Sequence, residues 1–152
     1  VRTFNKVLRE LEIDPSKIII RDASGLSREN KLTADILSQL LYKIHSDPLF
    51  SQMIDGLPVG GETGTLSERY IKSAPQAVGL VKAKTGTLSG TVSLAGYVQS
   101  GDREYAFTII ADKIQRTTAA SERARKTVDI FLGKIAAPLM APIGETPTVI
   151  IG

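Results

Sequence analysis

The sequence has no cysteine, no tryptophan and a single histidine, His45, in 152 residues. Without cysteine it contains no disulfide framework and no thiolate-bound metal. One histidine also excludes a histidine-rich metal cluster, so we expect neither a metal site nor a cofactor. A serine hydrolase built on this chain would need lysine as its base, unless His45 were placed for that role. Because His45 lies near the end of an amphipathic run, we interpret it as an ordinary surface residue.

Long apolar runs are missing as well, and these residues include no transmembrane run, signal peptide or lipidation motif. Helical periodicity begins directly at Val1, which we interpret as a polypeptide with something removed from its front. Lysine and arginine outnumber the acids by 19 to 16, giving a net charge of +3 and a pI near 9.2. These charges are scattered, without a basic block or basic–aromatic interleaving, which argues against nucleic-acid binding. A hydrophobic content of 42% is typical of a globular domain.

The most informative stretch runs from Lys82 to Leu88 (KAKTGTL) and lies between two apolar runs. Alternation and β-branched residues predict strands over about 79–86 and 91–99, joined by a short turn. Lys82 and Lys84 fall on one face of the first strand. Burying an ammonium group on a sheet face costs free energy unless it is paired or solvated, so the presence of two lysines in this strand calls for an explanation.

Lys84-Thr85-Gly86 is a tripeptide that occurs in penicillin-binding proteins and serine β-lactamases. A lysine on a strand presents positive charge to a substrate carboxylate, and the threonine hydroxyl can hydrogen-bond the same group. The glycine lets a substrate backbone approach the strand edge closely. A tripeptide alone also arises by chance, in which case Lys84 would be an ordinary exposed lysine near a hairpin.

Local patterns predict the remaining elements. We expect a third strand, at about 104–112, and a short buried strand or extended segment at 17–21. The basic residues of the last helix more readily mark a solvated face than a partner site. Five helical segments are expected from periodicity, caps and prolines: Val1–Leu11, a helix capped by Thr33, one starting at Asp47-Pro48, a short one at 67–74, and Ala120–Ile135 with Arg123, Arg125 and Lys126.

Three sequence elements follow one another along the chain. The first is the polar turn 22–30 (DASGLSREN), the second is the glycine-rich loop 57–66, which lacks the lysine of a phosphate-binding loop, and the third is 83–88 with 94–97. In this order the sequence resembles the S13 family of D-alanyl-D-alanine carboxypeptidases/endopeptidases. These are class C low-molecular-mass penicillin-binding proteins of the penicillin-binding-protein-4 type.

The resemblance covers residues 1–135 and implies an α+β, β-lactamase/transpeptidase-like fold in partial form. We expect three antiparallel strands of its sheet, the C-terminal helix and part of the helical side, with residues 136–152 as a proline-containing tail. The family's sheet has five strands, two of them from its N-terminal part. The sheet would therefore have an open edge unless the missing N-terminal part or a second chain covers it.

The resemblance also implies roles for particular residues. Lys84, Thr85 and Gly86 match the family's Lys-Thr-Gly element, in which lysine and threonine hold the substrate carboxylate. Ser27 and Asn30 are the candidates for its Ser-x-Asn element, although asparagine stands here three residues after the serine instead of two. Ser24 is the alternative serine. Thr87 would lie beside the substrate, with its backbone N–H as an oxyanion donor.

The chain departs from the family in lacking the Ser-x-x-Lys nucleophile, because no serine is followed by lysine three residues on. Thr3-Phe4-Asn5-Lys6 has the spacing but begins with threonine and lies in a predicted helix. We therefore expect the C-terminal part of an extracytoplasmic, serine-type D-Ala-D-Ala carboxypeptidase, inactive alone, whose partners are peptidoglycan peptides and β-lactams. The alternatives are a nucleophile-free peptidoglycan- or protein-binding module, and a β-lactamase or esterase of the same superfamily.

Overall fold

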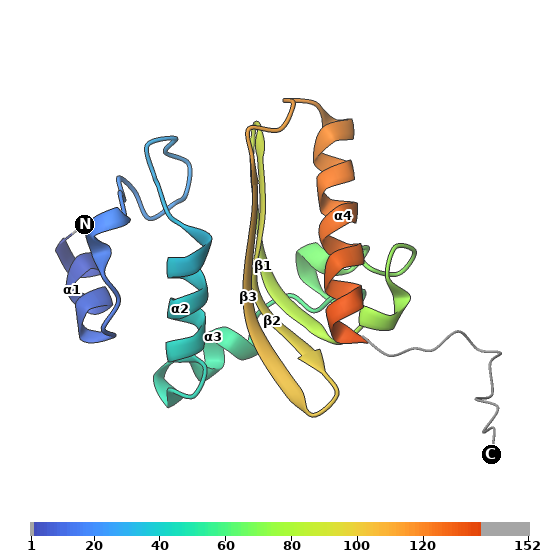
Figure 1. The fold of residues 1–152 in the computed structure, drawn as a ribbon, viewed down its shortest axis with the longest axis horizontal. Helices are drawn as coiled ribbons and strands as arrows, with labels where there is room; N and C mark the ends of the chain where they lie inside the picture. The colour runs from blue at the N-terminus through green and yellow to red at the C-terminus, as the bar shows by residue number, and fades with distance from the viewer. Residues whose placement is uncertain (1, 138–152) are drawn as a thin grey trace, which may run out of the picture.

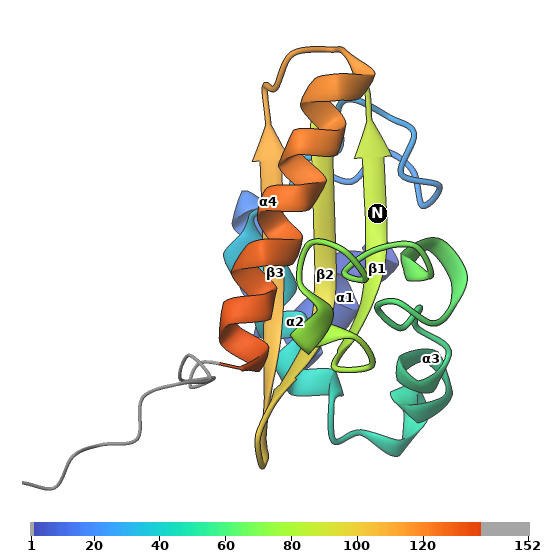
Figure 2. The same ribbon diagram turned by 90° about the vertical axis from the view of Figure 1, so that its right-hand side faces the viewer.

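Three antiparallel strands stand between helices on both of their faces (Figures 1 and 2). The structure, a computed structural model, describes residues 2–137, so the predicted tail lies almost entirely outside the described residues. In Figure 1, α4 covers one face of the sheet, α2 lies on the other, and α1 packs outside α2. The helices are α1 (Arg2–Glu10), α2 (Ala34–Ile44), α3 (Ser51–Asp55) and α4 (Thr118–Ala136), with short 3-10 turns at Pro15–Lys17, Pro48–Phe50, Gly64–Leu66 and Pro75–Ala77.

The sheet has the order β1-β2-β3, with β1 (Val81–Leu88), β2 (Thr91–Ser100) and β3 (Arg103–Asp112). Both connections are tight hairpins, and Gly90 and Gly101 take positive φ angles of 88° and 61° there, which glycine adopts at little cost. The three predicted strands and their antiparallel order are confirmed, although β1 starts two residues later than the pattern indicated. The strand that carries Lys84 is consequently an edge strand.

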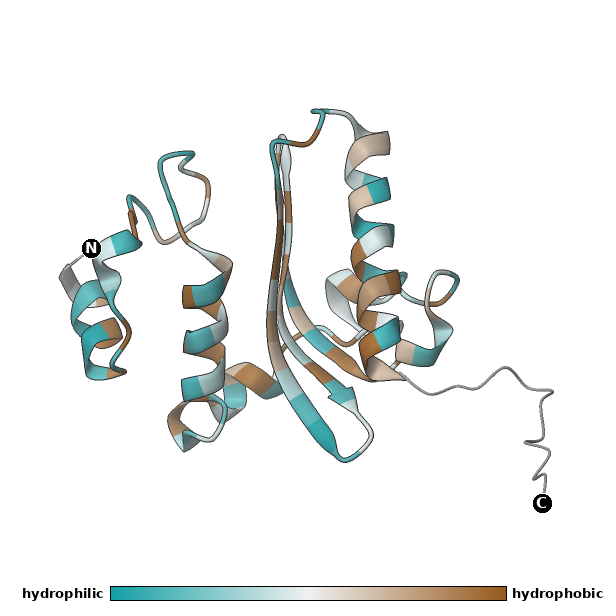
Figure 3. Cartoon of the chain, in the orientation of Figure 1, coloured by the Kyte–Doolittle hydropathy of each residue, from teal (hydrophilic) through white to brown (hydrophobic). Residues whose placement is uncertain are grey.

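Alternation along the strands divides the sheet into two faces. Apolar residues occupy its middle, and the end at the β2–β3 hairpin is hydrophilic (Figure 3). The face toward α4 forms the main core, and a second, smaller core lies between α1 and α2. The main core consists of Leu66, Tyr70, Ala74, Ala77, Val81, Ala83, Leu94, Val98, Val128, Leu132 and Ala136, and the smaller one of Leu8, Ile13 and Ile36.

Two predicted caps are present in the structure. The Thr33 hydroxyl accepts a hydrogen bond from the backbone N–H of Ile36 at 3.2 Å and begins α2. The Asp47 carboxylate accepts one from the N–H of Leu49 at 2.9 Å, where Pro48 starts a 3-10 turn that leads into α3. These side chains satisfy backbone donors that a helix start leaves unpaired. Local sequence therefore fixes both helix starts.

Two predicted elements differ. Residues 67–74 form turns instead of a helix, because Tyr70 takes a positive φ of 71°, which interrupts helical backbone. The 17–21 segment forms only one antiparallel bridge, in which Ile19 exchanges hydrogen bonds of 2.9 and 2.7 Å with Lys31. Ile19 is 40% exposed, so the segment is extended but not buried.

At Gly96 the backbones of β1 and β2 leave no room for a side chain. A Cβ at this position would collide with the carbonyl oxygen of Lys82 and the Cα of Ala83, and a strand backbone cannot rotate away as a side chain does. We expect Gly96→Ala to lower the free energy of unfolding by about 1–3 kcal/mol, measured by thermal and urea denaturation. Gly86→Ala is the matched control, because its Cβ would meet the rotatable Ser93 hydroxyl. Equal losses in both variants would contradict this account of the packing.

Candidate functional site

The outer edge of β1 is covered along only part of its length. The N–H of Gly60 donates to the carbonyl of Val81 at 2.8 Å, and the N–H of Ala83 donates to the carbonyl of Pro58 at 2.9 Å. Val81 and Ala83 thus point their backbone groups away from β2. Because this direction alternates along an antiparallel strand, Thr85 and Thr87 point their N–H and C=O groups the same way. Beyond the 58–60 segment, these two residues make up the free edge of β1.

Lys84 projects from the face of β1 opposite α4. It shares this face with Lys82, which pairs with Tyr97, and the Tyr97 hydroxyl donates to the carbonyl of Leu41 in α2 at 2.8 Å. The Lys84 side chain is exposed, and its Nζ donates to the carbonyl of Thr85 at 2.7 Å. The ammonium group of Lys84 is therefore exposed to solvent at the free edge of β1. The strand accommodates this lysine because its charge is not buried.

Two contacts at the free edge could not be foreseen from the sequence. The hydroxyl of Thr85 is hydrogen-bonded to that of Thr65 at 3.0 Å, which joins the glycine-rich loop to the Lys-Thr-Gly strand. Arg125 Nη2 donates to Thr87 Oγ1 at 3.1 Å from α4. The assignment of Arg125 to a solvated face was wrong, since its side chain is half-buried and engaged with β1. Its neighbours Arg123 and Lys126 are exposed, as expected.

The 22–30 turn is organised by the carboxylate of Asp22. Its oxygens accept hydrogen bonds from the N–H groups of Gly25 at 2.9 Å and Ser27 at 2.8 Å, and from the Asn30 side-chain amide at 2.9 Å. The hydrogen bond from Asn30, together with those from Gly25 and Ser27, lowers the pKa of Asp22 below its ordinary value. Asp22 was not among the predicted site residues, yet it shapes the turn that carries Ser27.

Asn30 is engaged within the same turn at both ends of its side-chain amide. Its Oδ1 accepts from the N–H of Arg21 at 2.7 Å, and its Nδ2 donates to Asp22. In this structure Asn30 therefore holds the turn together, and its predicted catalytic role stays a prediction.

Ser27 is half-buried, and its hydroxyl accepts from the N–H of Glu29 at 3.3 Å. The neighbouring Arg28 donates from Nη1 to the carbonyl of Ser89 at 3.3 Å, which places the turn beside the β1–β2 hairpin. The turn lies on the α2 side of the sheet (Figure 1), which is also the face from which Lys84 projects. The arrangement is compatible with a site formed by Ser27 and Lys84, whose catalytic roles stay predictions.

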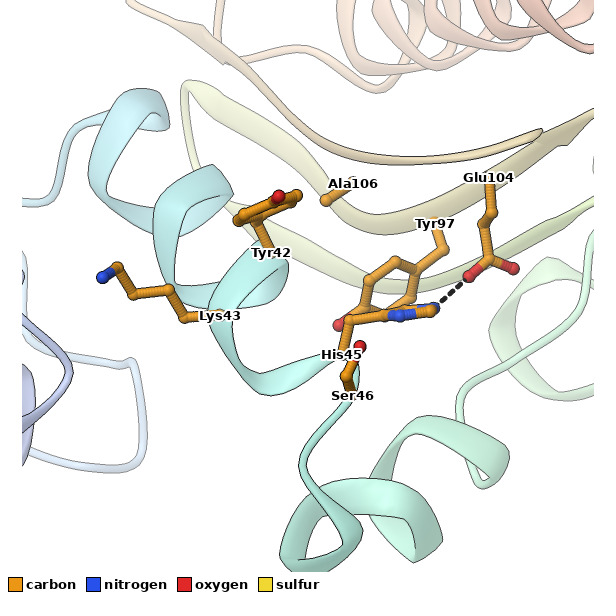
Figure 4. Close-up of a pocket in the computed structure, with 7 residues that line it drawn as sticks. All are labelled: Tyr42, Lys43, His45, Ser46, Tyr97, Glu104 and Ala106. Atoms are coloured by element: carbon orange, nitrogen blue, oxygen red, sulfur yellow. Dashed lines mark hydrogen bonds and ion pairs between the residues drawn. The ribbon is translucent and has the colours of Figure 1, made fainter.

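A cavity of about 270 Å³ lies between the end of α2 and strands β2 and β3 (Figure 4). His45 Nε2 lies 2.5 Å from Glu104 Oε2, and the His45 ring packs against Tyr97 with centroids 5.0 Å apart. Lys43 points away from the cavity in Figure 4 and binds Glu12 at 3.1 Å instead. His45 is thus a link between α2 and β3 more than a plain surface residue, and its Nε2 is already engaged.

A buried ion pair stabilises the segment on which the glycine-rich loop packs. Arg69 Nη2 lies 2.5 Å from Asp129 Oδ1 of α4, with side chains only 13% and 6% exposed. The adjacent Tyr70 is buried, and a Cβ on Gly60 would strike its ring, so the loop backbone rests on this ring. Breaking one partner of such a pair leaves an uncompensated buried charge, at a cost of roughly 3–5 kcal/mol. The pair therefore holds the loop that reaches β1.

Within residues 2–137, no cluster of three or more histidine or acidic side chains could hold a metal ion. In the same range no helix is long and apolar enough to cross a bilayer.

Comparison with known proteins gives a consistent result. Residues 1–135 match the sequence model of the D-Ala-D-Ala carboxypeptidase 3 (S13) family. A D-alanyl-D-alanine carboxypeptidase from Actinomadura sp. strain R39 is 41% identical over 110 residues, which are 69% of this chain and 20% of that protein. The carboxypeptidase DacB of Mycolicibacterium smegmatis is 40% identical over 111 residues, 69% of this chain and 24% of that protein.

Solved structures agree on the fold. Penicillin-binding protein 4 of Haemophilus influenzae, determined in complex with a β-lactam, superposes with a TM-score of 0.71 at 27% identity. The match covers 84% of this chain and 30% of that one. The α+β, transpeptidase-like fold is thereby confirmed as a partial domain. The chain spans no more than 30% of the length of any of these three proteins.

The role of Asp22 can be tested by removing its carboxylate. We expect Asp22→Ala to raise amide hydrogen exchange at Gly25 and Ser27 by roughly tenfold, because each N–H loses its acceptor. Glu29→Gln is the control, since it breaks only the exposed ion pair with Arg21, with side chains 73% and 61% exposed, and should change little.

The pH dependence follows from the lowered pKa of Asp22. The turn's stabilisation should be present above the ordinary carboxyl pKa and be lost as pH falls through the lower folded value. NMR chemical shifts of the two amides measure this, and shifts that titrate above the ordinary pKa would contradict it.

Proposed function

Because the chain belongs to the D-Ala-D-Ala carboxypeptidase 3 (S13) family, we propose that it is the C-terminal part of a serine-type D-Ala-D-Ala carboxypeptidase. Its work would be on peptidoglycan stem peptides outside the cytoplasm, in the periplasm or cell wall. The single observation that carries this proposal is the free edge of β1, which bears Lys84, Thr85 and Thr87 and leads to the hairpin that Arg28 of the Ser27 turn contacts.

The reaction proposed for the longer protein is acyl transfer. A serine of a Ser-x-x-Lys element, supplied by residues outside these 152, attacks the carbonyl of the D-Ala-D-Ala bond. Its proton passes by way of Ser27 to the leaving D-alanine nitrogen, and water then hydrolyses the acyl-enzyme. Penicillin would enter as a mimic of the dipeptide and remain at the acyl stage.

The residues of this chain would bind and orient the substrate. Lys84 and the Thr85 hydroxyl hold the terminal carboxylate by charge and hydrogen bonding. The outward N–H of Thr87 is directed toward the free edge, where it can donate to the oxyanion that develops on the attacked carbonyl. Gly86, without a side chain, leaves room for the peptide backbone along β1.

A covering partner for the sheet is part of the same proposal. The backbone groups of Ala106, Thr108 and Ile110 in β3 point away from β2 by the alternation described above. Beside this edge, β3 and α4 form an apolar groove of about 540 Å³ that includes Phe131, which is 54% exposed. We propose that the N-terminal part of the longer protein pairs with this edge and fills the groove, a second copy of the chain being the other candidate.

Labelling with a fluorescent penicillin tests the function. The longer protein should be labelled covalently, and the 152 residues alone should not, because they lack a nucleophile. Lys84→Ala should lower the acylation rate roughly 10²–10³-fold, as expected for a group that stabilises developing charge. Lys82→Ala, on the same face of β1, is the matched control and should stay near the wild-type rate.

Each other outcome is informative. A longer protein that takes up no label and hydrolyses no D-Ala-D-Ala peptide would contradict the proposal and favour a binding module. Rapid turnover of the bound penicillin would instead favour a β-lactamase. Equal effects of the two lysine variants would contradict the role of Lys84.

The open edge predicts a difference in hydrogen exchange. In the 152-residue chain, the amides of Ala106, Thr108 and Ile110 should exchange quickly, since they face outward from the last strand. In the longer protein the same amides should be protected, at least about 100-fold if they join a stable ladder. Unchanged exchange would show that nothing pairs with β3.

A further inference from the structure

Arg125 reaches the proposed substrate edge from the opposite side of the sheet to Lys84. It lies in the first half of α4, and its Nη2 donates to the Thr87 hydroxyl at 3.1 Å. Its main-chain carbonyl accepts from Arg69 at 3.4 Å, so the helix turn that carries it is fixed by the buried Arg69–Asp129 pair. The guanidinium is therefore held in place at the edge of β1.

The partner of Arg125 is a neutral hydroxyl. Within residues 2–137, no carboxylate lies within ion-pair distance of its guanidinium, although it is half-buried. A guanidinium has five N–H donors and ordinarily pairs with a carboxylate or phosphate when it is partly buried. The guanidinium of Arg125 thus has no ion-pair partner among these residues, although Glu122 and Asp129 line the same cavity, and beside the free edge it would stabilise an anionic group.

The hydrogen bond has a consequence for Thr87. A hydroxyl has one proton and two lone pairs, and here one lone pair accepts from Arg125. The Thr87 proton remains available, and the adjacent positive charge makes it a stronger donor. Thr85 differs in having a neutral partner, the hydroxyl of Thr65, so that no adjacent positive charge strengthens it as a donor.

We propose that Arg125 is a positioning residue that orients the Thr87 hydroxyl to donate to the terminal carboxylate of the substrate. It acts through Thr87, and its charge makes the edge selective for peptides that end in a free carboxylate. The inference rests on the proposed function and adds a second cation, from the C-terminal helix, to the one that Lys84 supplies.

Two substrates that differ only in the carboxylate separate this role from a structural one. An acyl-D-alanyl thioglycolate carries the terminal carboxylate, and its methyl ester does not. In the longer protein, Arg125→Gln should lower kcat/KM for the acid about tenfold, and for the ester less than about twofold. The ester serves as an internal control for folding, and Arg123→Gln and Lys126→Gln, at exposed positions of the same helix, should leave both substrates unchanged.

A double-mutant cycle tests whether Arg125 acts through Thr87. In a Thr87→Val background, Arg125→Gln should change kcat/KM for the acid by less than about twofold. Equal losses for acid and ester, or a full tenfold loss that persists without the Thr87 hydroxyl, would overturn the inference and leave the proposed function intact. If the unmutated protein hydrolyses neither thioester and takes up no penicillin, both the proposed function and this inference fail.

Discussion

The structure depends on one constraint, which is that a strand paired on a single side must leave alternate backbone groups unsatisfied. In β1 the segment 58–60 pairs with the carbonyl of Val81 and the N–H of Ala83, and no farther along the strand. The N–H and C=O groups of Thr85 and Thr87 point in the same outward direction, and the segment 58–60 does not pair with them. An extended peptide laid along this edge would continue a ladder that the protein has already begun, and this supports the proposal of a peptide substrate.

The surroundings of the edge are built to hold it in place from both faces. On one face, Arg28 links the Ser27 turn to the β1–β2 hairpin. On the other, the buried pair Arg69–Asp129 fixes both the ring under Gly60 and the helix turn that carries Arg125. The hydroxyls and cations of the edge thereby stand on elements that are held in place, which would lower the ordering cost of binding the proposed substrate.

Much of this could be predicted from sequence, because the signals were local. Period-two alternation gave the three strands, and Thr33 and Asp47 marked helix starts by side chains that cap them. The contacts Thr65–Thr85 and Arg125–Thr87 join residues 20 and 38 positions apart, and no local pattern reports such pairs. The expected helix at 67–74 failed for the same reason, since Arg69 and Tyr70 are held by tertiary contacts with α4 and the loop.

The central claim is that the Ser27 turn and the free edge of β1 lie together on one side of the sheet. Because the chain has no cysteine of its own, any cross-link must join the two cysteines that are introduced. Cross-linking of Arg28→Cys to Ser89→Cys by a short bismaleimide, which spans a gap of the length of the arginine side chain that joins these positions, measures this proximity directly. The account predicts rapid cross-linking of that pair, scored by electrophoresis and mass spectrometry, and none between Arg28→Cys and Lys126→Cys, on the opposite face. Failure of the first pair, or equal cross-linking of both, would contradict it.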